Sequence, residues 1–378
     1  MSLGKCGAGV SVIAALLIVP GCSRREAQSV TSAPKPNPIF NQTALFLAGI
    51  KGPANSPFHS LENNSEWRSY SRDIVTTWDR ANREQFGPVD DFQKHNLAPL
   101  HSGGSFIFYP FGGPDVLYAT RFFPNAKVYV LAGLERVGEI RGSEQFSSKK
   151  LERELNGWKK ALTSIFERSF FVTSEMDSQF HGRVANGLLP MILLLLARSG
   201  YTIDDAHYGH LDPSGVFAYE EAASNIRHMG VEIDFHRGPE AVSRKLFYFS
   251  TRLGPEFEQD PSFARFLDRI GAPDTLVKSA SFLLHWEMCK ALRSYILKKS
   301  NLILEDDTGI PYRYFQNADW RVQLFGEYSR PDRPFHREYQ RDLAAAFLEA
   351  SKVKPLGFNL GYGAGRRPSS MLLAVRTK

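Results

Sequence analysis

Apolar and polar residues alternate along the chain with two different periods, and together they predict an α/β protein. From Ser65, apolar residues recur at steps of three and four, which predicts a helix that ends at Gly87-Pro88. Residues 106–111 and 127–134 are largely apolar runs, typical of strands buried on both faces. Residues 116–123 between them suffice for two helical turns, so this region predicts a β-α-β unit with parallel strands.

The remaining pattern extends this arrangement. Further helices are expected from residue 148 and at 188–197, 274–298 and 334–351, and further strands at 231–235, 246–250, 302–304 and 321–325. Two apolar runs, 356–362 and 371–375, flank a glycine-containing turn and predict a closing antiparallel β-hairpin. We therefore expect a doubly wound, mostly parallel sheet with a helical insertion at about 145–200. This order of elements resembles the class I methyltransferase architecture, which is Rossmann-like.

The N-terminal segment predicts export. An apolar stretch at 10–19 is shorter than the roughly 20 residues of a membrane span but suits a signal peptide. The tetrapeptide Val-Pro-Gly-Cys at 19–22 resembles a bacterial lipobox, which implies lipidation at Cys22; plain secretion and an uncleaved anchor are the alternatives. Residues 22–57 are rich in Ser, Pro, Asn, Gln and Ala and predict a disordered tether. The expected organisation is a signal peptide at 1–21, a tether at 22–57 and a single α/β domain at 58–378.

The charge distribution bears on nucleic-acid binding, and the cysteine content bears on the state of the remaining thiol. The net charge of +6 comes from 46 basic and 40 acidic residues that are scattered, without the basic and aromatic alternation of a nucleic-acid groove. We expect that the protein does not bind nucleic acid. We expect it to be attached to the membrane through its N-terminal lipid. Once Cys6 leaves with the signal peptide and Cys22 is acylated, Cys289 remains alone, and its apolar surroundings predict a buried, inert thiol.

Polar residues follow the first two predicted strands, where ligands bind in open α/β sheets. Gly112 and Gly113 form a tight turn, Asp115 precedes the helix, and Glu135 lies about 20 residues further on, as a ribose-binding acid would. This predicts a nucleotide or S-adenosylmethionine site. However, the chain has no Gly-x-Gly-x-x-Gly, and Pro114 removes a backbone N–H. A structural turn with Asp115 as helix cap, or a site for another polar ligand, therefore remains open.

A second acidic cluster follows the predicted strand at 302–304. If that strand lies near the first, Asp306 and Asp307 approach Asp115 and Tyr109 at one rim. Carboxylates that lie close together raise one another's pKa and are suited to acid–base chemistry or to holding a cation. Arg313 would equally neutralise them in an ion-paired turn.

A third cluster, at 204–212, contains His207 and His210 with flanking aspartates. His-x-x-His can ligate zinc, but the segment is expected in a loop and offers no clear further ligand, so no metal is expected. Other histidines, including His285, are expected to be structural.

Three motifs together resemble a family of exported bacterial proteins: YPFGGPD at 109–115, YVLAGLE at 129–135 and DDTGIPYR at 306–313. No activity is assigned to that family, so the resemblance implies export but no catalytic residue or cofactor. We expect an envelope lipoprotein that binds a small polar ligand at a rim built from these candidates: Tyr109, Gly112, Gly113, Asp115, Glu135, Asp306, Asp307 and Arg313. The alternative is an enzyme, either a transferase on a methyltransferase-like frame or a carboxylate- or metal-dependent hydrolase.

Overall fold

The computed structural model describes residues 37–377, apart from short stretches at 101–105, 141, 147–150, 169–186, 223–227, 239–241, 350, 352 and 364–367. The predicted signal peptide and Cys22 lie outside the described residues. Within them, every helix is too short or too polar to cross a membrane.

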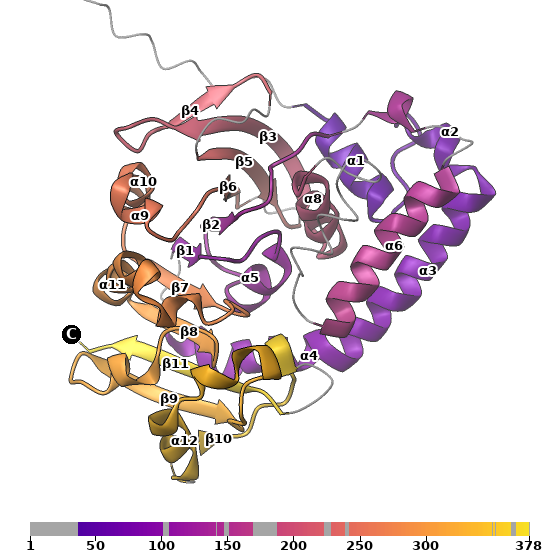
Figure 1. The fold of residues 1–378 in the computed structure, drawn as a ribbon. Coiled ribbons are helices and arrows are strands. Elements are labelled where there is room, and N and C mark those ends of the chain that lie inside the picture. The colour runs from indigo at the N-terminus through magenta and orange to yellow at the C-terminus, as the bar shows by residue number, and fades with distance from the viewer. Residues whose placement is uncertain are drawn as a thin grey trace, which may run out of the picture. The chain divides into compact units, whose positions relative to one another are not determined.

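One mixed sheet of 11 strands runs through the body, in the order β10-β9-β11-β8-β7-β1-β2-β6-β5-β3-β4 (Figure 1). The strands are β1 (Phe106–Tyr109), β2 (Val128–Gly133), β3 (Thr202–Leu211), β4 (Phe217–Glu220), β5 (Met229–His236), β6 (Arg244–Ser250), β7 (Pro273–Val277), β8 (Leu302–Asp306), β9 (Trp320–Gly326), β10 (Val353–Lys354) and β11 (Ser370–Arg376). Five of these described strand pairs are parallel and five are antiparallel. The α/β class is confirmed, but the prediction of a mostly parallel sheet is wrong.

The middle of the sheet contains the predicted β-α-β unit. β1 and β2 are parallel neighbours, joined by α5 (Val116–Phe122), and the parallel set extends to β6 on one side and to β7 and β8 on the other. Alternate residues of β1 enter different cores: Ile107 and Tyr109 pack in one, Phe106 and Phe108 in the other. Both faces of these strands are therefore buried, as their apolar runs predict.

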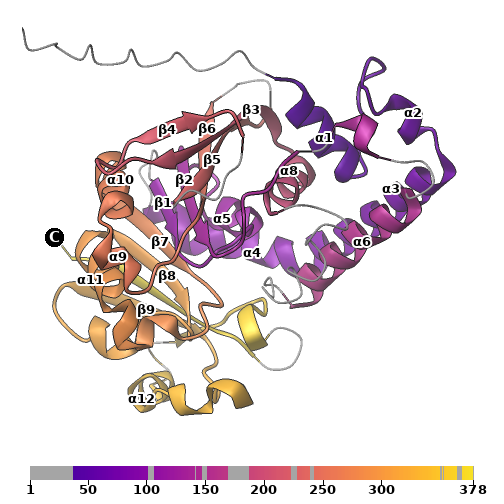
Figure 2. The ribbon, with the colours of Figure 1, turned by 45° about the horizontal axis from the view of Figure 1, so that its top comes forward.

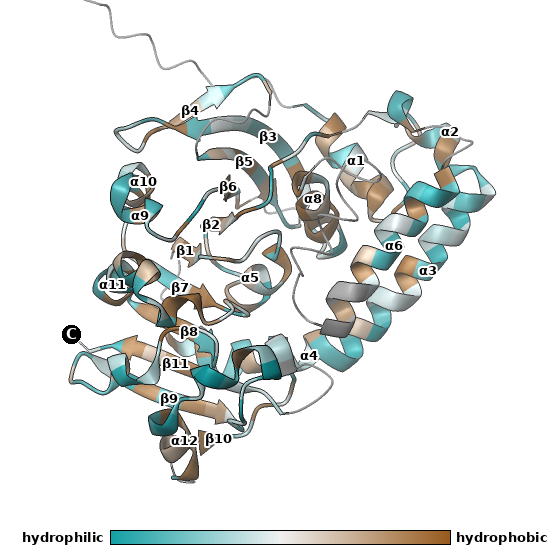
Figure 3. Ribbon diagram, viewed as in Figure 1, coloured by the Kyte–Doolittle hydropathy of each residue, from teal (hydrophilic) through white to brown (hydrophobic). Residues whose placement is uncertain are grey.

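Helices cover both faces of the sheet (Figure 1, Figure 2). One core includes residues from α1 (Ile39–Leu47), α3 (Ser65–Ala81), α4 (Gly87–Phe92), α5, α6 (Leu151–Arg168) and α8 (Leu189–Arg198). The other includes residues from α9 (Glu256–Gln259), α10 (Ser262–Ile270), α11 (Lys290–Lys299) and α12 (Arg341–Leu348). The short α2 (His59–Glu62) precedes α3. Figure 3 shows α8 as almost wholly hydrophobic, whereas α3 and α6, which lie side by side, carry many hydrophilic residues.

The folded body begins earlier than the sequence predicts. α1 lies inside the predicted tether, yet Phe46 and Leu47 are buried. Trp67 Nε1 donates to the carbonyl of Phe46 at 3.1 Å, and the hydroxyl of Tyr70 donates to that of Leu47. The tether boundary at 57 is therefore wrong, because a nine-residue amphipathic helix docks onto α3 and α8 despite its polar flanks.

Two expected helices have different bounds. The helix from Ser65 does not end at Gly87-Pro88: a π-helical turn, Asn82–Phe86, leads directly into α4, whose first turn accommodates Pro88. The helix expected at 274–298 is wrong in its first part, where β7 forms, and becomes α-helical at α11.

The closing hairpin is also wrong. Residues 356–362 form no strand, and β11 lies antiparallel between β8 and β9. Its partners lie far away in sequence, so the nearness of two apolar runs along the chain is a poor guide to pairing.

Candidate functional site

In the turn after β1, Gly112–Asp115, the backbone N–H groups form hydrogen bonds within the turn and to β2. The N–H of Gly113 donates to the carbonyl of Ala132 in β2 at 3.3 Å, and the N–H of Asp115 donates to that of Gly112 at 3.0 Å. Gly113 has φ +51°, a conformation that suits glycine. Because Pro114 has no N–H, the turn offers few amides to a phosphate. This geometry favours the structural interpretation of the turn over a nucleotide grip.

Asp115 lies in a buried charged network. Its Oδ2 accepts from the hydroxyl of Tyr109 at 2.9 Å and lies 2.8 Å from Nζ of Lys278, and its Oδ1 accepts from the N–H of Tyr118 at 3.2 Å as the cap of α5. The Lys278 and Asp115 side chains are 1% and 4% exposed. Burial raises the pKa of Asp115, and Lys278 opposes this effect. The predicted cap is confirmed, while Lys278 was missed.

Asp306 ties the end of β8 to the end of β7. Its Oδ2 accepts from the N–H of Ser279 at 2.8 Å, and its Oδ1 accepts from the hydroxyl and the N–H of Thr308 at 2.6 and 3.0 Å. Burial raises the pKa of Asp306, against these hydrogen bonds. A Cβ on Gly361 would lie 2.6 Å from Oδ2, so the C-terminal segment packs directly on this carboxylate. Asp306 therefore lies near Tyr109 as predicted, but inside the protein.

The same edge concentrates unusual backbone conformations. Phe111 after β1, and Ser279, Ser281 and Phe282 after β7, have φ between 51° and 60°. Residues other than glycine rarely adopt this region, and such strain clusters at binding and catalytic sites. Buried charged side chains and strained backbone conformations therefore occur together at the carboxyl ends of the central strands.

Glu135 lies beside the glycine turn. Its Oε2 would be 2.6 Å from a Cβ on Gly133 and 3.8 Å from one on Gly113, and its carbonyl accepts from the hydroxyl of Tyr248 at 2.7 Å. The structure thus brings Glu135 to the edge that the sequence predicts, on the β2 side of the Asp115 network.

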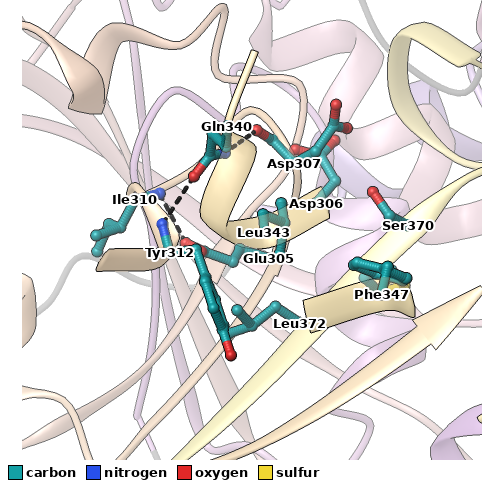
Figure 4. Close-up of a pocket in the computed structure, with 11 residues that line it drawn as sticks. Glu305, Asp306, Asp307, Ile310, Tyr312, Gln340, Leu343, Phe347, Ser370 and Leu372 are labelled. Atoms are coloured by element: carbon teal, nitrogen blue, oxygen red, sulfur yellow. Dashed lines mark hydrogen bonds between the residues drawn. The ribbon is translucent and has the colours of Figure 1, made fainter. Parts of the chain in front are cut away.

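A small pocket opens at the end of β8, between β11 and α12 (Figure 4). Its volume is about 10 Å³, close to the room that one water molecule needs. Polar and apolar side chains share the lining: Glu305, Asp306, Asp307, Tyr312, Gln340 and Ser370, with Ile310, Leu343, Phe347, Met371 and Leu372.

Two side chains fix the shape of this pocket. Gln340 accepts from the N–H of Tyr312 at 2.8 Å and donates to the carbonyl of Asp307 at 3.2 Å. Glu305 accepts from the N–H of Ile310 at 2.8 Å, and burial raises the pKa of this carboxyl well above its ordinary value. Burial therefore favours the protonated form of Glu305, which the sequence did not reveal.

Arg313 does not join the acidic cluster. It is exposed and lies over the ring of Tyr314, with its Cζ 5.0 Å from the ring centre. In the described part of the chain, it forms no ion pair with Asp306 or Asp307. The alternative of an ion-paired turn through Arg313 is therefore wrong.

The His-x-x-His segment lies on β3 rather than in a loop. Residues three apart on a strand point to opposite faces, and each histidine has its own carboxylate: His207 lies 3.3 Å from Asp205, and His210 lies 2.9 Å from Glu220. Among the described residues, no group of three potential ligands is placed to hold a metal ion.

Cys289 and His228 are buried away from the pocket. Cys289 is buried, and burial raises the pKa of its thiol. The Nδ1 of His228 lies 2.6 Å from the hydroxyl of Thr251, and its Nε2 lies 3.2 Å from Asp260. Thr251 is 8% exposed, so this chain of contacts joins the ends of β5 and β6 to the segment after α9.

Comparison with models of protein families, with curated proteins and with solved structures finds no match for this chain. The functional argument therefore depends on the chemistry of the residues themselves.

Proposed function

We propose that the protein is an exported, lipid-anchored envelope protein that binds a small polar ligand at the carboxyl ends of its central parallel strands. The N-terminal apolar segment and the lipobox-like tetrapeptide at 19–22 support the export step. The likeness of three motifs to a family of exported bacterial proteins supports the same assignment.

The observation that carries the binding proposal is the pocket beside the buried network. Two adjacent strand ends place Asp306 and Lys278 in the interior, and the same edge leaves Glu305 and Asp307 facing a cavity. Burying charge and straining backbone both cost stability, so their concentration at the strand edge that shares Asp306 with this cavity favours a binding role. Because the cavity has room for about one water-sized group, a ligand inserts only a single small polar group into it.

Asp307→Asn tests the pocket. We expect one class among small amines, polyols and amino acids to raise the thermal midpoint of the unaltered protein. The variant should bind that compound about tenfold more weakly, because a hydrogen bond to a charged group contributes about 1.5–3 kcal/mol. Asp319→Asn, at an exposed position away from the pocket, is the matched control. Equal binding by both variants, or no response to any compound, would contradict the proposal.

Calorimetry on the unaltered protein separates the enzymatic alternatives. Parallel strands followed by an antiparallel final strand are what the likeness to class I methyltransferases implies, and they support a transferase as the second candidate. Calorimetric heat with S-adenosylmethionine would favour that candidate, and heat with a divalent metal would favour the hydrolase. Heat with neither leaves the binding role.

The anchor has its own test. Cys22→Ser should abolish incorporation of labelled fatty acid and release the protein from the membrane fraction, because the thiol is the acceptor that a lipobox provides. Cys289→Ser should leave labelling unchanged, since Cys289 is buried. Continued labelling of the Cys22→Ser protein would exclude lipidation at this position.

A further inference from the structure

Three cationic or basic side chains gather where the segments after β7 and β8 meet. His285 ends a 3-10 helix, Leu283–His285, while Arg293 lies in α11 and Arg313 in a second 3-10 helix, Tyr312–Phe315. Both guanidinium groups lie over the ring of Tyr314, with their Cζ atoms 4.8 Å and 5.0 Å from its centre. This cluster is distinct from the pocket at Glu305.

Arg293 is buried without a carboxylate partner. The residue is 5% exposed, and its Nη1 donates to the carbonyls of Leu284 and Trp286 at 2.6 and 3.3 Å, on either side of His285. Across the described residues, no ion pair and no other hydrogen bond involves this guanidinium, although it has five N–H donors. Burying a cation without a counter-charge is unfavourable, so a bound negative group would stabilise this guanidinium.

The carboxylates around this cluster have other partners. Glu287 lies 2.9 Å from Lys290, and Glu256 lies 3.5 Å from Arg252. Glu338 lies 3.4 Å from Nδ1 of His285 and accepts from Nε1 of Trp286 at 3.3 Å. Among the described residues, none of the three forms an ion pair with Arg293.

His285 has one buried ring nitrogen without a hydrogen-bond partner. Its side chain is 8% exposed, its Nδ1 faces Glu338 at 3.4 Å, and its Nε2 is buried without a hydrogen-bond partner. This differs from the expectation that His285 is a satisfied structural residue. Burial, together with Arg313 and Arg293, lowers its pKa to about 4. An anion would cancel the repulsion from the arginines and favour protonation, which turns Nε2 into a donor.

We infer that His285, Arg293 and Arg313 form a binding site for a small oxyanion, a phosphate or carboxylate group. Arginine presents paired N–H donors that match the oxygens of such groups, and the buried Nε2 adds a third direction of contact. The inference stands independently of the pocket at Glu305.

Titration with inorganic phosphate, and separately with acetate, at constant ionic strength tests this site in the purified protein. The NMR signal of the His285 ring is the readout. We expect the anion to shift that signal and to raise the pKa of His285 above about 4, because the bound negative charge favours the protonated ring. Arg313→Gln should weaken binding about tenfold. Because Arg313 is exposed, this variant keeps the fold.

Arg330→Gln is the matched control, because Arg330 is also exposed and also lies over a tyrosine ring, 5.8 Å from the centre of Tyr339. It should bind like the unaltered protein. A response to one anion alone assigns the phosphate or the carboxylate class, and a response to both assigns oxyanions in general. No response of His285 to either anion, or equal losses in the two variants, overturns the inference.

Discussion

Asp115→Asn should lower the free energy of unfolding by about 3–5 kcal/mol, the usual cost of removing one partner from a buried ion pair. The single amide oxygen of asparagine can still accept from the N–H of Tyr118, and its NH2 group then replaces the oxygen that faces the hydroxyl of Tyr109 and Lys278. The variant therefore removes the charge opposite Lys278 while preserving the helix cap. Denaturant titration at neutral pH measures the change.

The double variant Asp115→Asn/Lys278→Met separates charge from packing. Once the ammonium is gone, most of the lost stability should return, because an apolar side chain of similar length replaces a buried cation. Lys290→Met changes the same residue type in an exposed pair with Glu287 and should leave the unfolding midpoint unchanged. If Asp115→Asn is as stable as the unaltered protein, or if the double variant is no better than the single one, the buried pair is not the cause.

The sequence predicts well those elements whose structure depends on residues close together in the chain. Most residues of β1 and β2 are apolar, and both strands are buried on both faces. Their apolar runs therefore identify them as strands even when the neighbouring strands are unknown. Asp115 is similarly local, since an aspartate before a short helical run is a common cap. These features explain why the glycine turn and the parallel pair were found.

The sequence did not reveal the role of Lys278 because the strand before it, β7, is stabilised by contacts with distant parts of the chain. β7 contains Asp274 and Thr275, which look unlike a buried strand, yet both are buried, and the hydroxyl of Thr275 lies 2.8 Å from that of Ser300. Polar residues whose partners come from elsewhere in the chain hide a strand from any periodicity rule. The apolar residues that follow then extend a false helical pattern over Lys278.

The pocket and the oxyanion site were hidden in the same way. Glu305 is the fourth residue of β8, and its raised pKa depends on burial beside β11 and near α12, which are distant in sequence. Arg313 was expected beside Asp306 and Asp307, and Arg293 was not singled out, since only the folded chain brings the two arginines to one tyrosine ring.

Glu305→Gln should stabilise the protein at neutral pH and flatten its stability profile. Burial raises the folded-state pKa of Glu305 well above its ordinary value of 4.5. The unfolded chain therefore releases this proton at lower pH than the folded one, so stability is lost as the pH rises from about 4.5 through the folded pKa. Each unit of elevation corresponds to about 1.4 kcal/mol. Glutamine carries no titrating proton, and its oxygen can still accept from the N–H of Ile310.

Denaturant titrations across a pH series measure this difference. Below the ordinary glutamate pKa the two proteins should be equally stable, because the carboxyl is then protonated in both the folded and the unfolded chain. Above it, the variant should gain steadily over the unaltered protein, while Glu327→Gln, at an exposed position, should follow the unaltered profile. Parallel profiles for the Glu305→Gln variant and the unaltered protein would mean that the carboxyl ionises freely in the folded state. The pocket would then be an open, hydrated acidic cleft rather than a dry cavity lined by a protonated acid.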